Sequence, residues 1–236
     1  MLKKLRFLVF VGVLLICSIP LAAGAVSINY THDTSGNEFI SPYAGVITED
    51  FEEGAVGSLA GLTPWSWSGN GAVQQGPLNV PDVASPPYGV SAKDASKYMS
   101  VPKLQNTGGA ALNTVTVTNL GGAYNYFGLW WGSADTYNTL SFYESGGLVA
   151  SFDGTAITTP NAANGYQIGP DQNLYVNFLG LPLFDSFQMT SFSAVGSSYA
   201  FESDNIAIGT VPEPTTMLLL GLGLLGVAGI RRKFKV

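Results

Sequence analysis

Apolar and polar residues alternate along several short stretches in the middle of the chain, and such alternation predicts β-strands. In residues 112–118, Val115 and Val117 face one side while three threonines face the other. The same pattern predicts strands at residues 46–51, 139–143, 148–152, 174–178, 187–189 and 198–208. No stretch between residues 26 and 211 repeats apolar residues at helical spacing. We therefore expect an all-β domain.

Glycine and proline separate the predicted strands, and short antiparallel strands joined by turns typically pack as two sheets. We predict a two-sheet antiparallel β-sandwich of jelly-roll type over residues 46–210, preceded by an extended lead-in at residues 26–45. In the last strand Phe201 and Ile206 are out of phase for a single face. We therefore expect an irregularity near Asp204.

The N-terminus has the three parts of a secretory signal peptide. Lys3, Lys4 and Arg6 are basic, residues 7–19 are apolar, and residues 23–25 are small. This order predicts a signal peptide over residues 1–25, with a mature chain that begins at Val26. An uncleaved N-terminal anchor is the alternative.

The C-terminus carries a second set of signals in residues 211–236. An acidic proline element comes first, an apolar stretch at 215–230 follows, and a basic cluster ends it: Pro212, Glu213, Pro214, then Arg231, Arg232 and Lys233. The apolar stretch predicts a short transmembrane helix. By the positive-inside rule the basic cluster stops transfer on the cytoplasmic side, which leaves the sandwich outside.

This C-terminal order resembles the PEP-CTERM sorting signal of Gram-negative bacteria. The resemblance implies that an exosortase, a membrane-embedded cysteine protease, recognises Pro212, Glu213 and Pro214 and processes the tail. It implies export by the secretion machinery, a transient stay in the inner membrane, and a final place at the cell surface or in the extracellular matrix. An ordinary tail anchor is the alternative, but it does not account for the Pro-Glu-Pro element.

Two internal segments are similar to stretches of one group of exosortase-dependent surface proteins. They are residues 126–140, which read Tyr-Phe-Gly-Leu-Trp-Trp-Gly-Ser-Ala-Asp-Thr-Tyr-Asn-Thr-Leu, and residues 201–207, which read Phe-Glu-Ser-Asp-Asn-Ile-Ala. This resemblance supports the same destination and implies no biochemical activity.

The charge of the mature domain excludes some partners. Seven of the ten basic residues lie in the two terminal segments, so the exported part keeps three lysines and no arginine against fifteen acidic residues. Nucleic acid is excluded as a partner because phosphate binding requires basic groups. The single cysteine, Cys17, leaves with the signal peptide, so disulfides cannot stabilise the domain.

The residues needed for catalysis are scarce. His32 is the one histidine, and the mature chain lacks cysteine. A zinc cluster of histidine and cysteine ligands therefore cannot form, and a Ser-His-Asp triad would depend on His32 alone. Most carboxylates lie in turn contexts, where aspartate is expected anyway. We predict that the protein is not an enzyme.

Acidic residues near the first and last predicted strands offer a candidate cofactor site. Glu52, Glu53 and Asp204 would supply carboxylates for a structural calcium ion if those strands are neighbours. The alternative is that these acids are turn or edge-strand charges that prevent strand pairing.

Aromatic residues offer a candidate ligand-binding site. Trp65 and Trp67 are two residues apart, so their rings share one side of a strand and would stack on sugars if exposed. Trp130 and Trp131 are adjacent, so one of them, taken as Trp131 for binding, should face outward. Asp135 and Tyr137 would line a loop-borne site beside it. Core packing of the tryptophans and simple turn formation are the alternatives.

These observations predict an exported, non-catalytic structural or adhesive component of the envelope or of the exopolysaccharide matrix of a biofilm. The alternative is a carbohydrate-binding module that recognises exopolysaccharide and is stabilised by calcium.

Overall fold

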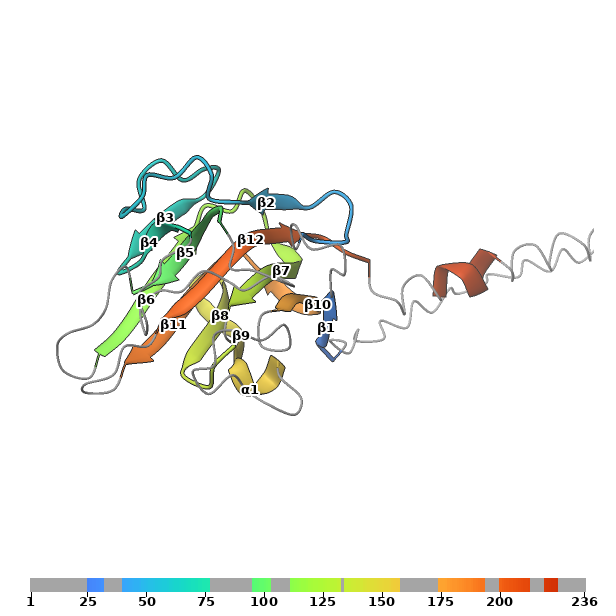
Figure 1. The fold of residues 1–236 in the computed structure, drawn as a ribbon. Helices are drawn as coiled ribbons and strands as arrows, with labels where there is room; N and C mark the ends of the chain where they lie inside the picture. Colours follow the sequence, from blue (N-terminus) through green and yellow to red (C-terminus); the bar gives the residue numbers. More distant parts are fainter. Residues whose placement is uncertain are drawn as a thin grey trace, which may run out of the picture.

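A computed structural model describes residues 25–31, 40–76, 95–102, 111–132, 134–157, 174–193, 200–212 and 219–224 (Figure 1). Within these ranges the chain forms twelve β-strands, a short helix, α1 (Gly154–Ile157), and a helical stretch at residues 219–224. All strand pairs are antiparallel, and they assemble into a seven-stranded and a five-stranded sheet. The predicted all-β, two-sheet sandwich is confirmed.

The seven-stranded sheet, called the large sheet below, has the order β1-β10-β7-β12-β5-β4, and β2 also pairs with β12. The last strand, β12, therefore has β7 on one side and both β5 and β2 on the other. Its strands are β1 (Ser27–Thr31), β2 (Ile47–Glu49), β4 (Ala72–Gln75), β5 (Lys97–Val101), β7 (Tyr124–Gly132), β10 (Leu174–Phe184) and β12 (Phe201–Gly209).

The five-stranded sheet, called the small sheet below, has the order β3-β6-β11-β8-β9. Figure 1 shows β6 and β11 running side by side along its length. Its strands are β3 (Ser66–Gly69), β6 (Ala111–Thr118), β8 (Asn138–Glu144), β9 (Gly147–Asp153) and β11 (Ser186–Ser193).

The core lies between the two sheets and is rich in aromatic rings. Phe127 of β7 is fully buried, and its ring contacts the rings of Phe142 and Phe187 from the small sheet at centroid distances of 5.1 and 4.9 Å. Phe178 and Phe184 of β10 complete the cluster. Apolar residues of the two sheets thus face one another, and edge-to-face packing of this kind is favourable for aromatic pairs.

The irregularity expected near Asp204 is present. The pairing of β12 with β7 shifts between Asp204 and Ala207, and Asn205 adopts a left-handed conformation with φ of 49°. This bulge returns Ile206 to the core side that Phe201 also occupies, which is why both residues are fully buried.

The segment predicted as an extended lead-in contains a strand of the sandwich. In residues 27–31 the β1 strand pairs with β10, and Val26, Ile28 and Tyr30 pack against the core. The alternation is only three apolar residues long and precedes a polar stretch, so the sequence pattern alone placed the start of the sandwich too late, at residue 46.

Candidate functional surfaces

The junction between the sandwich and the C-terminal signal is held by one side chain. β12 ends at Gly209, and two residues later the Val211 N–H donates to Asn125 Oδ1 at 2.9 Å. Asn125 Nδ2 donates in return to the Val211 carbonyl at 3.1 Å. Pro212, the first residue of the sorting element, is exposed. Glu213 and Pro214 lie outside the described residues.

Most of the remaining terminal signals lie outside the described residues as well: residues 1–24 and the stop-transfer residues Arg231, Arg232 and Lys233. The single histidine, His32, also lies outside them. Of the predicted transmembrane segment 215–230, residues 219–224 are described, and they are helical. No helix within the described ranges has the length and hydropathy needed to cross a lipid bilayer. The membrane helix therefore stays a prediction.

Of the two tryptophans proposed to stack on sugars, Trp65 belongs to the core and Trp67, which is half-buried, packs against it. Trp65 is only 4% exposed, and its ring centroid lies 6.0 Å from that of Trp67 and 6.0 Å from that of Phe187. Their rings share a side of the chain, as the spacing predicts. That side is the inner one, because the inner face of the small sheet covers the core. The core-packing alternative is thus what the structure shows, and Trp65 offers no open ring face to a sugar.

Trp131 is also a core residue. It is fully buried and stacks on Phe201 with ring centroids 4.5 Å apart. Trp130 points to the opposite face of the large sheet, as expected for adjacent strand residues, but there it is buried together with Tyr175. Trp130 therefore points away from the core without being exposed, because the outer face of the large sheet is covered.

Asp135 and Tyr137 form part of the connection between β7 and β8. Tyr137 Oη donates to Asp135 Oδ2 at 2.5 Å, and the Asn138 N–H donates to the Asp135 carbonyl at 3.1 Å. Gly154 packs so closely on this turn that an added Cβ would lie 2.2 Å from the Asp135 carbonyl oxygen. These contacts fit the turn-forming alternative.

The acids proposed for calcium have separate protein partners. Glu52 Oε1 accepts from a backbone N–H at 2.7 Å, Glu53 Oε2 from a hydroxyl at 3.2 Å, and Asp204 Oδ2 from a hydroxyl at 3.3 Å. The donors are Lys97, Thr63 and Ser96, respectively. β2 does lie beside β12, as a shared site would require. Within the described part of the chain, however, no three acidic, histidine or cysteine side chains are grouped so that they would hold a metal ion.

Glu49, a carboxyl at the border of the core, was not among the site residues predicted from the sequence. It is 4% exposed, and its Oε1 accepts from the Phe51 N–H at 2.7 Å. Its Oε2 has no hydrogen-bond partner among the described residues. Burial raises the pKa of Glu49 to about 7, repulsion from Asp50 and Glu53 adds to the rise, and the Phe51 N–H opposes it. In the predicted strand at residues 46–51, Glu49 and Phe51 are two residues apart, so alternation alone would have placed both side chains on the same face.

Polar groups on the outer face of the large sheet are buried and hydrogen-bonded. Tyr126 Oη donates to Asn177 Oδ1 at 2.7 Å and shares a second hydrogen bond with Ser41 Oγ at 2.7 Å. The Tyr175 hydroxyl donates to the Asn205 carbonyl at 3.1 Å. Burial raises the pKa of Tyr126 to about 12 and raises that of Tyr175 further. These side chains are therefore uncharged parts of the structure rather than reactive groups.

The outer face of the small sheet is open and carries rows of hydroxyl groups. One row runs across all five strands through Ser68, Thr116, Gln188, Ser141 and Ser151, which are direct cross-strand neighbours. We call the hydroxyl face this row together with Thr114, Thr139, Tyr143 and Thr190. All nine residues are exposed or half-buried. The sequences of the five strands contain no lysine and no arginine.

Hydrogen bonds between neighbours order the hydroxyl face. Gln188 Nε2 donates to Thr116 Oγ1 at 3.1 Å, and Tyr143 Oη donates to Gln188 Oε1 at 2.8 Å. The hydroxyls of Thr114 and Thr190 lie 3.1 Å apart. Beyond them, Leu112 and Phe192 stand opposite each other and are 69% and 47% exposed, respectively. The face therefore combines fixed hydroxyls with an exposed apolar pair.

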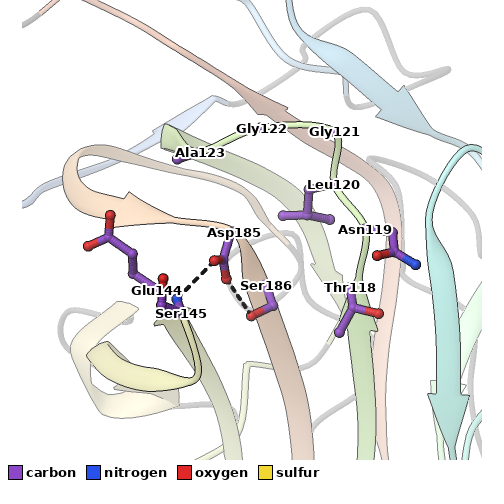
Figure 2. Close-up of a pocket in the computed structure, with 10 residues that line it drawn as sticks. All are labelled: Thr118, Asn119, Leu120, Gly121, Gly122, Ala123, Glu144, Ser145, Asp185 and Ser186. Atoms are coloured by element: carbon purple, nitrogen blue, oxygen red, sulfur yellow. Dashed lines mark hydrogen bonds between the residues drawn. The ribbon is translucent and has the colours of Figure 1, made fainter.

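A pocket of about 570 Å³ lies at one end of the hydroxyl face. It is lined by the β6–β7 connection and by the β8–β9 and β10–β11 turns. Figure 2 shows the Asp185 carboxylate between Ser145 and Ser186; it accepts from the Ser145 N–H at 2.8 Å and from Ser186 Oγ at 2.9 Å. The carboxylate thus joins two turns, while the Glu144 side chain extends away from it (Figure 2).

Comparison with known families identifies the C-terminal segment. The chain carries the PEP-CTERM protein-sorting motif, which matches residues 210–233. The motif implies export, processing by an exosortase, and a cell-surface or extracellular destination. It begins one residue before Val211, so the Asn125 contact lies inside the matched segment.

The solved structures that resemble the sandwich do so only distantly. No curated protein matches the chain. Among solved structures, it is similar to the K2 cleaved adhesin domain of Lys-gingipain at 13% identity and a TM-score of 0.42, over 72% of this chain and 100% of that one. It is also similar to the Agl-KA catalytic domain at 12% identity and a TM-score of 0.34, over 78% of this chain and 30% of that one. Likeness this low carries no argument about function.

Proposed function

We propose that this protein is a non-catalytic structural or adhesive component of the cell surface or extracellular matrix, delivered there by exosortase processing. The sorting motif at residues 210–233, directly after the last strand of the sandwich, carries this proposal. Trp65 and Trp131 pack in the core and Asp135 holds a turn, so these residues serve the fold rather than a ligand, which supports a structural role.

The cellular location of the protein and the processing of its C-terminal tail together test this function. In a host that makes an exosortase, Glu213→Ala should leave the protein in the inner membrane with its tail attached, while the wild-type chain reaches the surface or matrix fraction. Glu144→Ala replaces an exposed acid on the sandwich and is the matched control. Equal delivery of Glu213→Ala and the wild-type chain would contradict the proposal.

A second candidate function is the binding of a neutral exopolysaccharide, and the hydroxyl face favours it. Its rows repeat at about 4.8 Å across strands and at about 6.7 Å along each strand. Sugar hydroxyls both donate and accept hydrogen bonds, as serine and threonine hydroxyls do. The exposed Phe192 ring adds an apolar contact. The five strands offer no cation for an anionic glycan. This surface takes the place of Trp65, which is buried, and Trp67, which is half-buried, as the proposed sugar-binding site.

Binding assays with two neutral polymers, dextran and cellulose, and one anionic polymer, alginate, test whether the protein binds a neutral exopolysaccharide. Thr116→Lys combined with Thr190→Lys should reduce binding to the neutral polymers at least tenfold, because two long side chains then interrupt the rows. Ser27→Lys, on the exposed side of β1, is the matched control and should bind as the wild type does. Preference for alginate, or equal binding by both variants, would remove this second candidate and leave the first in place.

A further inference from the structure

The side chain of Asn125 occupies both backbone polar groups of Val211. Its amide oxygen accepts from the Val211 N–H at 2.9 Å, and its amide nitrogen donates to the Val211 carbonyl at 3.1 Å. A side-chain amide that pairs in this way imitates the backbone of a neighbouring strand, since it supplies one donor and one acceptor at the same position. We call this pair of hydrogen bonds the Asn125 clamp.

The clamp extends the order of β12 beyond the end of its ladder. The last backbone pair between β12 and β7 joins Gly209 to Tyr126, the residue after Asn125. Gly209 is itself held against Val46, since an added Cβ there would lie 3.0 Å from Val46 Cγ1. The clamp adds a further attachment at Val211. Pro212, which follows, has no N–H and cannot continue the pattern.

The position of the clamp coincides with the boundary between the sandwich and the sorting signal. Val211 is half-buried and Pro212 is exposed. A protease acts on chain that is extended and free of other partners, so cleavage requires local opening wherever the backbone is already hydrogen-bonded. Val211 is bonded through both of its backbone groups, and no hydrogen bond of this kind is open to the nitrogen of Pro212.

We propose that Asn125 is a positioning residue for the sorting signal. It fixes Val211 to the sandwich, so that processing is confined to Pro212 and the residues after it while β12 remains protected. This inference rests on the proposed function, because it concerns the same processing event. It assigns to a residue 86 positions upstream in the sequence a part in deciding where the mature chain ends.

Hydrogen exchange at Val211 tests the clamp without any processing enzyme. In the full chain in detergent, Asn125→Ala should accelerate exchange of the Val211 amide about tenfold, because its acceptor is lost. Asn125→Asp keeps an acceptor oxygen and should restore much of the protection. Asn29→Ala, at an exposed position on β1, is the control and should leave exchange unchanged. Identical exchange in Asn125→Ala and the wild type would overturn the proposal.

The C-terminus of the processed protein tests its consequence. In the exosortase-producing host, the wild-type chain should end at one position, at or after Pro212. Asn125→Ala should add ends at or before Val211, and Asn125→Asp should show fewer of them. A single, unchanged end in Asn125→Ala would overturn the role of Asn125 alone. Retention of the complete tail in every variant, the wild type included, would overturn the proposed function and this inference with it.

Discussion

The outer faces of the two sheets are built from similar polar residues but have opposite surroundings. On the large sheet, Tyr126 and Asn177 are fully buried. Ser41 and Tyr43, from the segment that leads into β2, lie against Tyr126. On the small sheet, Thr116 and Gln188 remain in contact with solvent. Alternation directs both sets away from the core, so cover from other segments decides which set is buried.

This difference assigns the two faces different roles. A buried polar group must find a partner within the protein, because leaving it unsatisfied costs about 1–3 kcal/mol. The outer face of the large sheet therefore contributes to stability through its specific hydrogen bonds. The hydroxyl face loses little stability when one of its hydrogen bonds exchanges with water, which is the property that the proposed binding of a polysaccharide requires.

Overpacking should separate the faces most clearly. A Cβ at Gly128 would lie 2.4 Å from Tyr126 Oη and 2.8 Å from Tyr175 Oη, both on the covered face. Gly128→Val should therefore lower the free energy of unfolding by about 3 kcal/mol. Gly147→Ala, at the start of β9, meets only the Glu144 carbonyl at 3.4 Å and should change it by less than about 0.5 kcal/mol. Urea unfolding of both variants measures the contrast, and equal losses would break it.

A pH titration should sharpen the distinction between covered and open carboxyls. The pKa of Glu49 is raised to about 7, so its contribution to stability is complete below about pH 4.5 and decreases as the pH rises toward 7. Glu49→Gln should abolish this decrease and stabilise the protein at pH 8 by about 2 kcal/mol, since desolvation of the amide offsets part of the gain.

The measurement for Glu49 is the free energy of unfolding between pH 4 and pH 9. Glu144→Gln, at an exposed position on the small sheet, is the matched control and should retain the wild-type profile. A Glu49→Gln profile that still falls between pH 4.5 and 7 would assign the decrease to other groups.

Matched removal of one hydroxyl should give a smaller effect. Tyr126→Phe removes the buried hydrogen bonds to Asn177 and Ser41 and should cost about 1.5 kcal/mol. Tyr143→Phe removes a bond to Gln188 on the hydroxyl face, where water replaces it, and should cost less than about 0.5 kcal/mol. Chemical denaturation measures both, and a larger loss for Tyr143→Phe would reverse the comparison.

The smallest effect is expected within the rows of the hydroxyl face. Thr190→Val keeps the β-branched shape and loses only the hydroxyl near Thr114, so stability should stay within about 0.5 kcal/mol of the wild type. Thermal unfolding checks this value. A loss above about 1 kcal/mol would show that the rows stabilise the fold rather than remain available for binding.

The sequence pattern predicted those features that depend on local alternation. It placed seven of the twelve strands, put Trp65 and Trp67 on one side, and located the irregularity at Asp204, because each of these follows from a period of two. It did not place β7, which pairs with both β10 and β12. It failed where a distant segment decides the outcome. The burial of Trp130 depends on cover over the outer face of the large sheet, which no local pattern records.

The candidate sites show the same difference between features set by local sequence and features set by contacts between distant segments. The sorting signal is a linear motif, so its residues were evident from the sequence, and the motif is found there. Glu49 and the Asn125 clamp arise from contacts made by folding: the clamp joins residues 86 positions apart. The hydroxyl face requires the register of five strands, which alternation within single strands does not specify.

The intact mass of the mature protein, recovered from a host that makes an exosortase, tests the central claim most directly. We expect a single species that begins at Val26 and lacks the basic cluster at residues 231–233, found at the surface or in the matrix. A full-length chain in the cytosol, with Met1 and Val236 both present, would contradict the account.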